Sequence, residues 1–253
     1  MQNRAPTDEV LERPLVYAIG DIHGCVDLLE DLLETISADA AQVPRVEKYI
    51  LCLGDYVDRG PQSAAVIARL RSGVDGFDLI TLSGNHETMM VDALSGGDPQ
   101  AVHHWLANGG ASTLVSYGVD PHYVIDVGVR HLPSVLRADL EWMRDLPLAI
   151  QFDTPDGAFF FVHAGVRPGM PLDSQTVDDV LWIREPFLRY TGDFGARIVH
   201  GHTPVGPEVL WNRINLDAGA FMHGALYAAA LDCEHSVRQN PRLLFAGESR
   251  RYD

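Results

Sequence analysis

The sequence predicts an α/β fold in a single domain, and three observations lead to that prediction. Short apolar, partly β-branched runs alternate with segments whose apolar residues recur at helical spacing. Several of the apolar runs end in glycine-containing stretches that carry aspartate, asparagine or histidine. The 253 residues suit one large α/β domain, and the sequence has no repeat, low-complexity tract or linker that would divide it. We therefore expect residues 1–253 to form one domain.

The first third of the chain is expected to alternate strands and helices. The apolar runs of strand length lie at 15–19, 49–53 and 78–82. The segments with helical spacing lie at 26–36 and 63–71, and residues 37–47 are expected to be a loop or a short helix. Each strand is followed by a loop, as in a βα unit, so polar residues in these loops are expected at the carboxyl end of the sheet.

The pattern changes between residues 88 and 145, where apolar residues recur at helical spacing between glycine and proline turn signals. This stretch predicts a helical insert, and its last helix is expected at 134–144. A short helix is expected at 181–190. The remaining strands are predicted at 148–152, 159–162, 196–199, 214–216, 225–231 and 242–245.

Composition excludes some partners. The formal charge of -16, from 35 acidic and 19 basic residues, argues against binding to nucleic acid or to an anionic membrane. No apolar run approaches the ~20 residues of a membrane span, and the polar segment 1–14 is not expected to be a signal peptide. Cys25, Cys52 and Cys233 are few, odd in number and far apart, so we expect reduced thiols and a cytoplasmic protein.

Donor side chains follow five of the predicted strands. They are Asp21 and His23, Asp55, Asn85 and His86, His163, and His200 with His202. The carboxyl ends of strands in an open α/β sheet form the usual ligand-binding edge, so these residues are expected to converge. A buried carboxylate there requires a cation. Oxygen and nitrogen donors without cysteine suit Mn²⁺, Fe or Zn²⁺ and argue against a structural zinc site.

The motifs together resemble one family. They are Gly-Asp-Ile-His-Gly at 20–24, Gly-Asp-Tyr-Val-Asp-Arg-Gly at 54–60, Gly-Asn-His-Glu at 84–87, His-Ala-Gly at 163–165 and Gly-His-Thr-Pro at 201–204. In this order and spacing, the chain is similar to the calcineurin-like metallophosphoesterases over residues 15 to about 231. The nearest branch is that of the bacterial phosphoprotein phosphatases, with the lambda-type Ser/Thr phosphatases and the symmetrical diadenosine tetraphosphatases.

The resemblance implies a four-layer α/β/β/α sandwich around two divalent metal ions, with Mn²⁺ expected and Fe or Zn²⁺ as alternatives. It implies that Asp21 and His23 bind the first ion and that Asp55 bridges both ions. Asn85, His163 and His202, the remaining predicted ligands, would complete the coordination of the second ion. A hydroxide shared by two ions would attack phosphorus directly, without a covalent phosphoenzyme.

The same resemblance implies roles in proton transfer and phosphate binding. His86 would protonate the leaving group, and Asp58 would orient its imidazole. Arg59 would bind the phosphate oxygens together with Asn85. Arg184, in Leu-Trp-Ile-Arg-Glu at 181–185, matches the tryptophan-then-arginine pattern of the bacterial branch as a second phosphate ligand, and Arg167 is its competitor.

The expected function is a protein Ser/Thr phosphatase that hydrolyses phosphomonoesters. The alternatives are a symmetrical dinucleoside polyphosphate hydrolase and a catalytically silent metal-binding module. The substrate would be a phosphoprotein or a phosphorylated small molecule, and the oligomeric state stays open. Glu87, the last residue of the motif at 84–87, is weighed as support for the site, and Asp217, outside the motifs, as either a partner of His202 or a turn residue. Three tryptophans are expected in the core: Trp105, Trp142 and Trp182.

Overall fold

The computed structural model describes residues 13–43, 47–96, 98–127 and 132–247. The N-terminal segment 1–14, expected not to be a signal peptide, lies almost entirely outside the described residues. Within the described chain, no helix is long and apolar enough to cross a membrane. The three cysteines are free thiols, as the sequence predicts.

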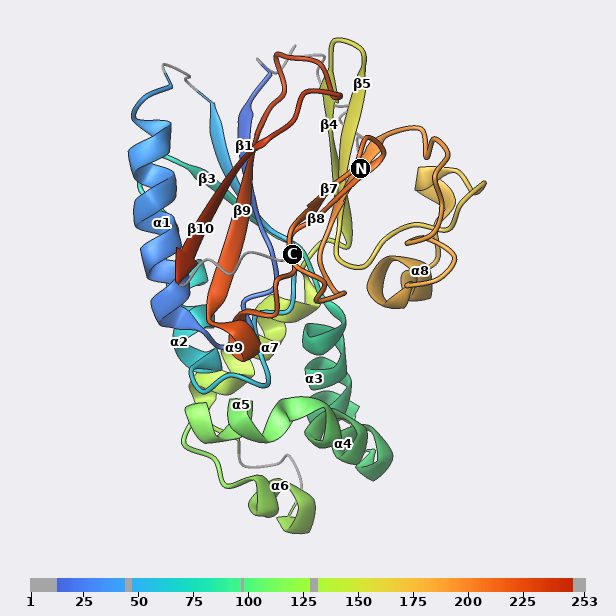
Figure 1. Ribbon diagram of the computed structural model, residues 1–253. Helices are drawn as coiled ribbons and strands as arrows, with labels where there is room; N and C mark the ends of the chain where they lie inside the picture. Colours follow the sequence, from blue (N-terminus) through green and yellow to red (C-terminus); the bar gives the residue numbers. More distant parts are fainter. Residues whose placement is uncertain (1–12, 44–46, 97, 128–131, 248–253) are drawn as a thin grey trace, which may run out of the picture.

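Two five-stranded sheets lie face to face (Figure 1). The first has the order β10-β9-β1-β2-β3, and β1, β2 and β3 are parallel to one another. Its strands are β10 (Arg242–Gly247), β9 (Ala225–Asp232), β1 (Leu15–Ile19), β2 (Lys48–Cys52) and β3 (Asp78–Thr81). The second has the order β4-β5-β6-β8-β7. Its strands are β4 (Ala149–Thr154), β5 (Gly157–Val162), β6 (Arg197–His200), β8 (Arg213–Asn215) and β7 (Glu208–Val209).

The alternation of side chains along the strands creates the layers. On β1, Val16 and Ala18 pack between the sheets with residues such as Phe161, whereas Tyr17 and Ile19 face the helices outside. The helices on that outer face are α1 (Val26–Ala40) and α2 (Ser63–Arg71). Helix α8 (Val177–Trp182) packs on the outer face of the second sheet. The four-layer α/β/β/α sandwich is therefore confirmed.

The helical insert gathers at one end of the molecule (Figure 1). It consists of α3 (Asn85–Gly96), α4 (Pro99–Trp105), a π-helical turn (Leu106–Gly110), α5 (Ala111–Ser116), α6 (Pro121–Val127) and α7 (Ser134–Arg144). Buried residues of the insert join the same core cluster as α1 and α2. Because α3 begins at Asn85 and not after residue 88, Asn85 and His86 lie in the first turn of a helix and not in a loop.

Local structure also differs from prediction at α8, β7 and α9 (Ala220–His223). The helix expected at 181–190 is wrong, because α8 begins after Thr176, which forms a capping box with Asp179, and the backbone becomes extended at Ile183. The short elements β7 and α9 were not expected from the sequence. A two-residue strand such as β7 exists only through its pairing with β8, which no local pattern encodes.

Candidate functional site

The donor residues meet beyond the ends of strands from both sheets. Strands β1, β2 and β3 of the first sheet and β5 and β6 of the second each lead into one of the predicted motifs. The donors that follow these strands are Asp21, His23, Asp55, Asn85, His86, His163 and His202. Each of them is at most 7% exposed. Segments that are far apart in the sequence therefore form one buried polar cluster.

The backbone is strained at this cluster. Among the residues that the structure describes, five non-glycine residues have a positive φ, and all five belong to the predicted site. They are His23, Asp55, Asp58, Arg59 and His202. A left-handed conformation costs a non-glycine residue roughly 1–3 kcal/mol. Such strain persists only where the surrounding structure enforces it, and its concentration here indicates a functional site.

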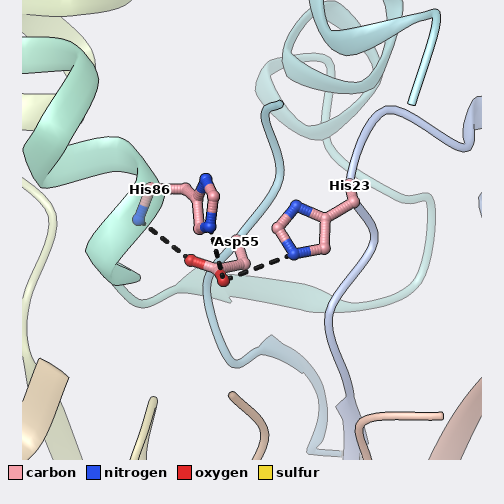
Figure 2. Close-up of side chains that lie close together, drawn as sticks. All are labelled: His23, Asp55 and His86. Atoms are coloured by element: carbon pink, nitrogen blue, oxygen red, sulfur yellow. Dashed lines mark hydrogen bonds and ion pairs between the residues drawn. The ribbon is translucent and has the colours of Figure 1, made fainter. Parts of the chain in front are cut away.

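Asp55 lies at the centre of the cluster. Its Oδ2 is 3.4 Å from Nε2 of His23 and 3.9 Å from Nε2 of His86, while Oδ1 accepts a 3.1 Å hydrogen bond from the backbone N–H of His86 (Figure 2). On the other side, Oδ1 is 3.4 Å from Nε2 of His163. Burial opposes ionisation of Asp55, but the surrounding histidines lower its pKa, so the carboxylate is charged.

Two groups of potential metal ligands share Asp55. One contains His23, Asp55 and His86, and the other contains Asp55, His163 and His202. In each group the ligand atoms lie within 4.8 Å of one another. A carboxylate common to two such groups is the arrangement that a pair of cations requires, because a shared anion offsets the repulsion between them.

The imidazoles are oriented and neutral. Nδ1 of His23 donates to the Val57 carbonyl at 2.7 Å, and Nδ1 of His163 donates to the Leu53 carbonyl at 3.0 Å. Each of these hydrogen bonds leaves Nε2 unprotonated, 3.4 Å from an oxygen of Asp55, and in His23 this nitrogen accepts a hydrogen bond from Arg59. Burial lowers the pKa of His23 to about 3 and also lowers the pKa of His163. Neutral imidazole with its other nitrogen held by a carbonyl is the form that binds a metal ion.

Lone pairs converge at the second group, which fits a cation. The Nε2 lone pair of His163 lies 2.9 Å from Oδ1 of Asn85, which is also an acceptor. Nδ1 of His202 lies 2.9 Å from the same oxygen and donates to it in the tautomer that leaves Nε2 as a lone pair. Nε2 of His202 is buried and has no hydrogen-bond partner within the described residues. Two acceptors in close contact are repulsive unless a cation lies between them, so this donor set fits divalent metal ions.

Asp21 lies at the edge of the cluster and belongs to neither group of three. Its carboxylate accepts the backbone N–H of His202 at 3.0 Å and hydrogen-bonds with Asp217. Burial and the charges of Asp217 and Asp55 raise the pKa of Asp21. Asp217, expected as a turn residue or as a partner of His202, accepts the Gly219 N–H at 2.8 Å, as a turn residue does, and also contacts Asp21. A cation beside these carboxylates would relieve their mutual repulsion.

His86 and Asp58 form a hydrogen-bonded pair. Nδ1 of His86 lies 2.7 Å from Oδ2 of Asp58, and Nε2 points toward Asp55. Burial would lower the pKa of His86, but the charge of Asp55 and the hydrogen bond to Asp58 outweigh it and raise that pKa. The arrangement can hold a proton on His86 and present it from Nε2 toward Asp55 and the groups of potential ligands. It also places His86 within ligand distance of His23 and Asp55, which the sequence did not indicate.

Two residues that hold the site in place, Glu87 and Trp105, were not assigned these contacts by the sequence. Glu87 accepts backbone N–H groups of Gly84, Asp55 and Tyr56 at 2.8, 2.8 and 2.7 Å, so it fixes the loop that carries Asp55. Trp105 is fully buried, as expected, yet its indole N–H donates to the Asp58 carboxylate. Only helical spacing marked Trp105 in the sequence, and this spacing cannot reveal a partner 47 residues away.

The arginines differ in what they contact. Arg59 is exposed, donates from Nη1 to Nε2 of His23 at 2.7 Å, and lies over the ring of Phe221 at 5.1 Å. Arg167 forms an ion pair with Asp179, with Nη2 and Oδ1 2.5 Å apart. Arg184 is exposed, and its charge contributes, after burial and His163, to lowering the pKa of His202 to about 3. Arg184 is therefore near the cluster, whereas Arg167 is engaged elsewhere.

Two further residues lie differently from their sequence interpretation. His200 is the weaker ligand candidate of the two histidines predicted at the end of β6. Its ring packs against Phe187, with 4.8 Å between the ring centroids, on the side of the second sheet that α8 covers. It does not join the ligand groups. Trp182, expected in the core, is 40% exposed, and its ring lies edge-on to His202 at 6.2 Å. It forms part of the wall of the site.

Comparison with known proteins agrees with this geometry. A model of the calcineurin-like phosphoesterase family matches residues 14–237. The chain is 26% identical over 221 residues to Serine/threonine-protein phosphatase 1 of Salmonella typhimurium, which covers 85% of this chain and 91% of that protein. It is 31% identical over 159 residues to the symmetrical bis(5'-nucleosyl)-tetraphosphatase of Paracidovorax citrulli, covering 63% of this chain.

That second match spans only 47% of the Paracidovorax protein, so the chain covers about half of its length. Among solved structures, a putative diadenosine tetraphosphatase superposes with a TM-score of 0.59 at 22% identity, covering 87% of this chain and 90% of that one. At this identity the superposition supports the fold alone. The family match covers most of the chain, and it includes every motif at the buried cluster. The chain belongs to the calcineurin-like phosphoesterase family.

Proposed function

We propose that this protein is a metal-dependent phosphoesterase that acts as one domain. Its proposed substrates are the phosphomonoesters phosphoserine and phosphothreonine in proteins. The observation that carries the proposal is the sharing of Asp55 between two groups of potential ligands. Two divalent ions held there would polarise the phosphoryl group and generate a nucleophile from water at neutral pH. Every other step falls to residues of the chain.

The proposed ligands follow from their positions. Asp21 and His23 would hold the first ion, Asp55 would contact both, and the second would be held by Asn85, His163 and His202. The His163 Nε2 lone pair beside Oδ1 of Asn85 supports this assignment, as does the buried His202 Nε2, which has no hydrogen-bond partner among the described residues. Mn²⁺ is the proposed ion because the donors are oxygens and imidazole nitrogens and no thiolate is among them. Fe and Zn²⁺ are compatible with the same donors.

Phosphate binding is assigned to Arg59, Asn85 and Arg184. Arg59 and Arg184 are exposed side chains next to buried histidines of the cluster, so their guanidinium groups can reach a phosphate bound there. His86 would donate the proton that the departing alkoxide needs, and Asp58 would keep Nε2 of His86 pointed at it. Binding alone would require neither member of this pair, which disfavours a catalytically silent module.

The extent of similarity is compatible with a protein phosphatase but also with a dinucleotide hydrolase. Serine/threonine-protein phosphatase 1 aligns over 91% of its length, the symmetrical tetraphosphatase over about half, and an asymmetrical bis(5'-nucleosyl)-tetraphosphatase of Halalkalibacterium halodurans over 87%. The formal charge of -16 disfavours a highly charged tetraphosphate as substrate. The substrate class proposed first is therefore a phosphorylated protein.

A dinucleoside polyphosphate is the second candidate, and Trp182 is the observation that favours it. Its indole is 40% exposed beside His202, and an exposed aromatic ring next to a phosphate site can stack with a nucleobase. A phosphoserine side chain offers no ring for such a contact. The two candidates therefore differ in whether Trp182 takes part in binding.

Phosphate release by the Mn²⁺-loaded protein tests the proposal. The panel is phosphoserine, phosphothreonine and phosphotyrosine peptides and diadenosine tetraphosphate, each with native protein and with Trp182→Ala. We expect higher kcat/KM on the phosphoserine and phosphothreonine peptides and little effect of Trp182→Ala on them. A preference for the dinucleotide that is lost in Trp182→Ala would establish the second candidate instead. Inactivity on the whole panel, with two metal ions bound, would reject both.

A further inference from the structure

One segment of the helical insert packs directly on the loop that carries Asp58 and Arg59. This segment, residues 105–113, runs from the end of α4 through the π-helical turn into α5. Asp58 and Arg59 are consecutive non-glycine residues with positive φ, 71° and 68°. Asp adopts this conformation more readily than most residues, but Arg does not, and two such residues in succession persist only where the surrounding contacts enforce the conformation.

The side chain of Asp58 is surrounded by donors from this segment. The indole Nε1–H of Trp105 lies 3.0 Å from Oδ1 and 2.9 Å from Oδ2, and the Thr113 hydroxyl donates to Oδ1 at 2.7 Å. Asp58, Trp105 and Thr113 are all fully buried. With Oδ1 occupied by Thr113, Oδ2 is left for His86 at 2.7 Å. The carboxylate is thereby held in one orientation.

The backbone of the loop is held by the same segment. The Asp58 N–H donates to Oγ1 of Thr113 at 2.8 Å and to Oγ of Ser63 at 3.1 Å. The Arg59 N–H donates to the Gly109 carbonyl at 3.2 Å. Thr113 therefore contacts both the main chain and the side chain of Asp58, and Gly109 contacts the next residue.

The two glycines of the segment are required by this close packing. A Cβ on Gly109, whose φ is +109°, would lie 2.8 Å from the Arg59 backbone nitrogen. A Cβ on Gly110 would lie 2.4 Å from the Trp105 ring. Backbone approach at these distances excludes a side chain, which accounts for the Asn108-Gly109-Gly110 turn signal in the sequence.

We propose that residues 105–113 are the positioning element for the proton donor and the phosphate ligand of this site. Trp105 and Thr113 orient Asp58 and, through it, His86. Gly109 fixes the backbone of Arg59. The insert thus acts through its contacts with Asp58 and with the backbone of Arg59. Trp105 is a positioning residue that does not touch substrate. This inference rests on the proposed function for its kinetic test only, because the contacts themselves can be tested without turnover.

The kinetic arm compares Trp105→Phe and Thr113→Val with native protein on two substrates. Trp105→Phe keeps a ring but removes the donor, and Thr113→Val keeps the shape but removes the hydroxyl. We expect kcat on a phosphoserine peptide, whose alkoxide needs a proton, to fall about 10-fold or more. On p-nitrophenyl phosphate, whose leaving group needs little protonation, we expect a change of about 2-fold or less. Thr113→Ser should restore most of the loss.

Matched controls separate positioning from general damage. Trp142→Phe changes another tryptophan of the insert, whose ring centroid lies 6.3 Å from that of Tyr56 and which is not among the hydrogen-bond partners that the structure shows for the Asp58 carboxylate. It should leave the ratio of the two substrates unchanged. Bound Mn²⁺ and Tm are measured for every variant. Equal loss on both substrates, or an unchanged substrate ratio in Trp105→Phe and Thr113→Val, would overturn the proposal.

A spectroscopic arm tests the geometry independently of activity. In a ¹H–¹⁵N spectrum, the indole resonance that disappears in Trp105→Phe should be slow to exchange with solvent. The same resonance should move upfield in Asp58→Asn, because a charged acceptor is replaced by a neutral one. A Trp105 resonance that does not respond to Asp58→Asn would refute the inference. If this arm succeeds while the native protein hydrolyses neither substrate, the proposed function fails and the positioning contact stands.

Discussion

Nδ1 of His86 lies 2.7 Å from Oδ2 of Asp58, although 28 residues separate the two in the chain. The pair directs Nε2 of His86 toward Asp55 and the centre of the site. We therefore expect His86→Asn to reduce the rate by ~10²–10⁴ on alkyl phosphate substrates and much less on activated aryl phosphates. Steady-state kinetics on a phosphoserine peptide and on p-nitrophenyl phosphate measure the difference. Equal losses on both would mean that His86 is not the proton donor.

The same pair predicts a pH dependence. A proton donor must be protonated, so the rate falls as pH rises through its pKa. The charge of Asp55 and the hydrogen bond to Asp58 raise the pKa of His86, which extends activity toward higher pH. Asp58→Asn removes the negative charge from this hydrogen bond and should move the alkaline limb of the kcat profile to lower pH. An alkaline limb that stays in place in Asp58→Asn would exclude His86 as its source.

Arg184 and Arg167 should differ in their effect on substrate binding. Arg184 is exposed close to His202, whereas Arg167 is held by Asp179 at 2.5 Å. Loss of a charge-assisted contact costs about 1.5–3 kcal/mol, so Arg184→Ala should lower kcat/KM roughly 10- to 100-fold. Arg167→Ala should change kcat/KM by about 2-fold or less. Asp179, the partner of Arg167, also accepts a hydrogen bond from the Thr176 hydroxyl, so its carboxylate keeps a partner in this variant. The reverse order of effects would assign the second phosphate ligand to Arg167.

Asp39 predicts an acid-dependent part of the folding stability. Its carboxylate accepts from Arg242 of β10 and from the Tyr17 hydroxyl at 2.6 Å each, and the Arg242 hydrogen bond is the main cause that lowers its pKa. A lowered pKa contributes stability that is complete above the unfolded-state pKa of about 3.9 and is lost as pH falls through the folded value.

Since Arg242 is half exposed, Asp39→Asn should reduce the free energy of unfolding by only about 0.5–1 kcal/mol at neutral pH. The difference from native protein should shrink in acid, as measured by urea unfolding at several pH values. Asp31→Asn, on an exposed position of the same helix, serves as the control and should have no such effect. A destabilisation that does not depend on pH would rule out the charged hydrogen bond as its cause.

Much of the fold could be predicted because its signals are local. The strand at 15–19 and the helix at 63–71 have the bounds that hydrophobic spacing predicts. The helix at 181–190 was misplaced because the capping box of Thr176 and Asp179 determines where α8 begins.

The candidate site was predictable for a different reason. Its donors follow strands, and strands of one sheet end at a common edge, so Asp21, Asp55 and Asn85 could be placed together after β1, β2 and β3. His163 follows β5 of the second sheet, and its place beside Asp55 was implied by the family resemblance and not by a shared sheet edge. Contacts between elements could not be predicted in this way. The contact of Trp105 with Asp58 depends on how the insert packs, and the contact of Asp217 with Asp21 depends on how the loop after β8 packs. No sequence periodicity encodes that packing.

The central claim is that one carboxylate, Asp55, joins two metal ions that the reaction requires. The most direct measurement is metal content together with phosphate release, for chelated protein reloaded with Mn²⁺, in native form and as Asp55→Asn. Asp75→Asn, at an exposed position, is the matched control. The account predicts two ions per chain and Mn²⁺-dependent release for the native and control proteins, and weakened metal binding with no turnover for Asp55→Asn. Near-normal rates in Asp55→Asn, or full activity with a single ion bound, would contradict it.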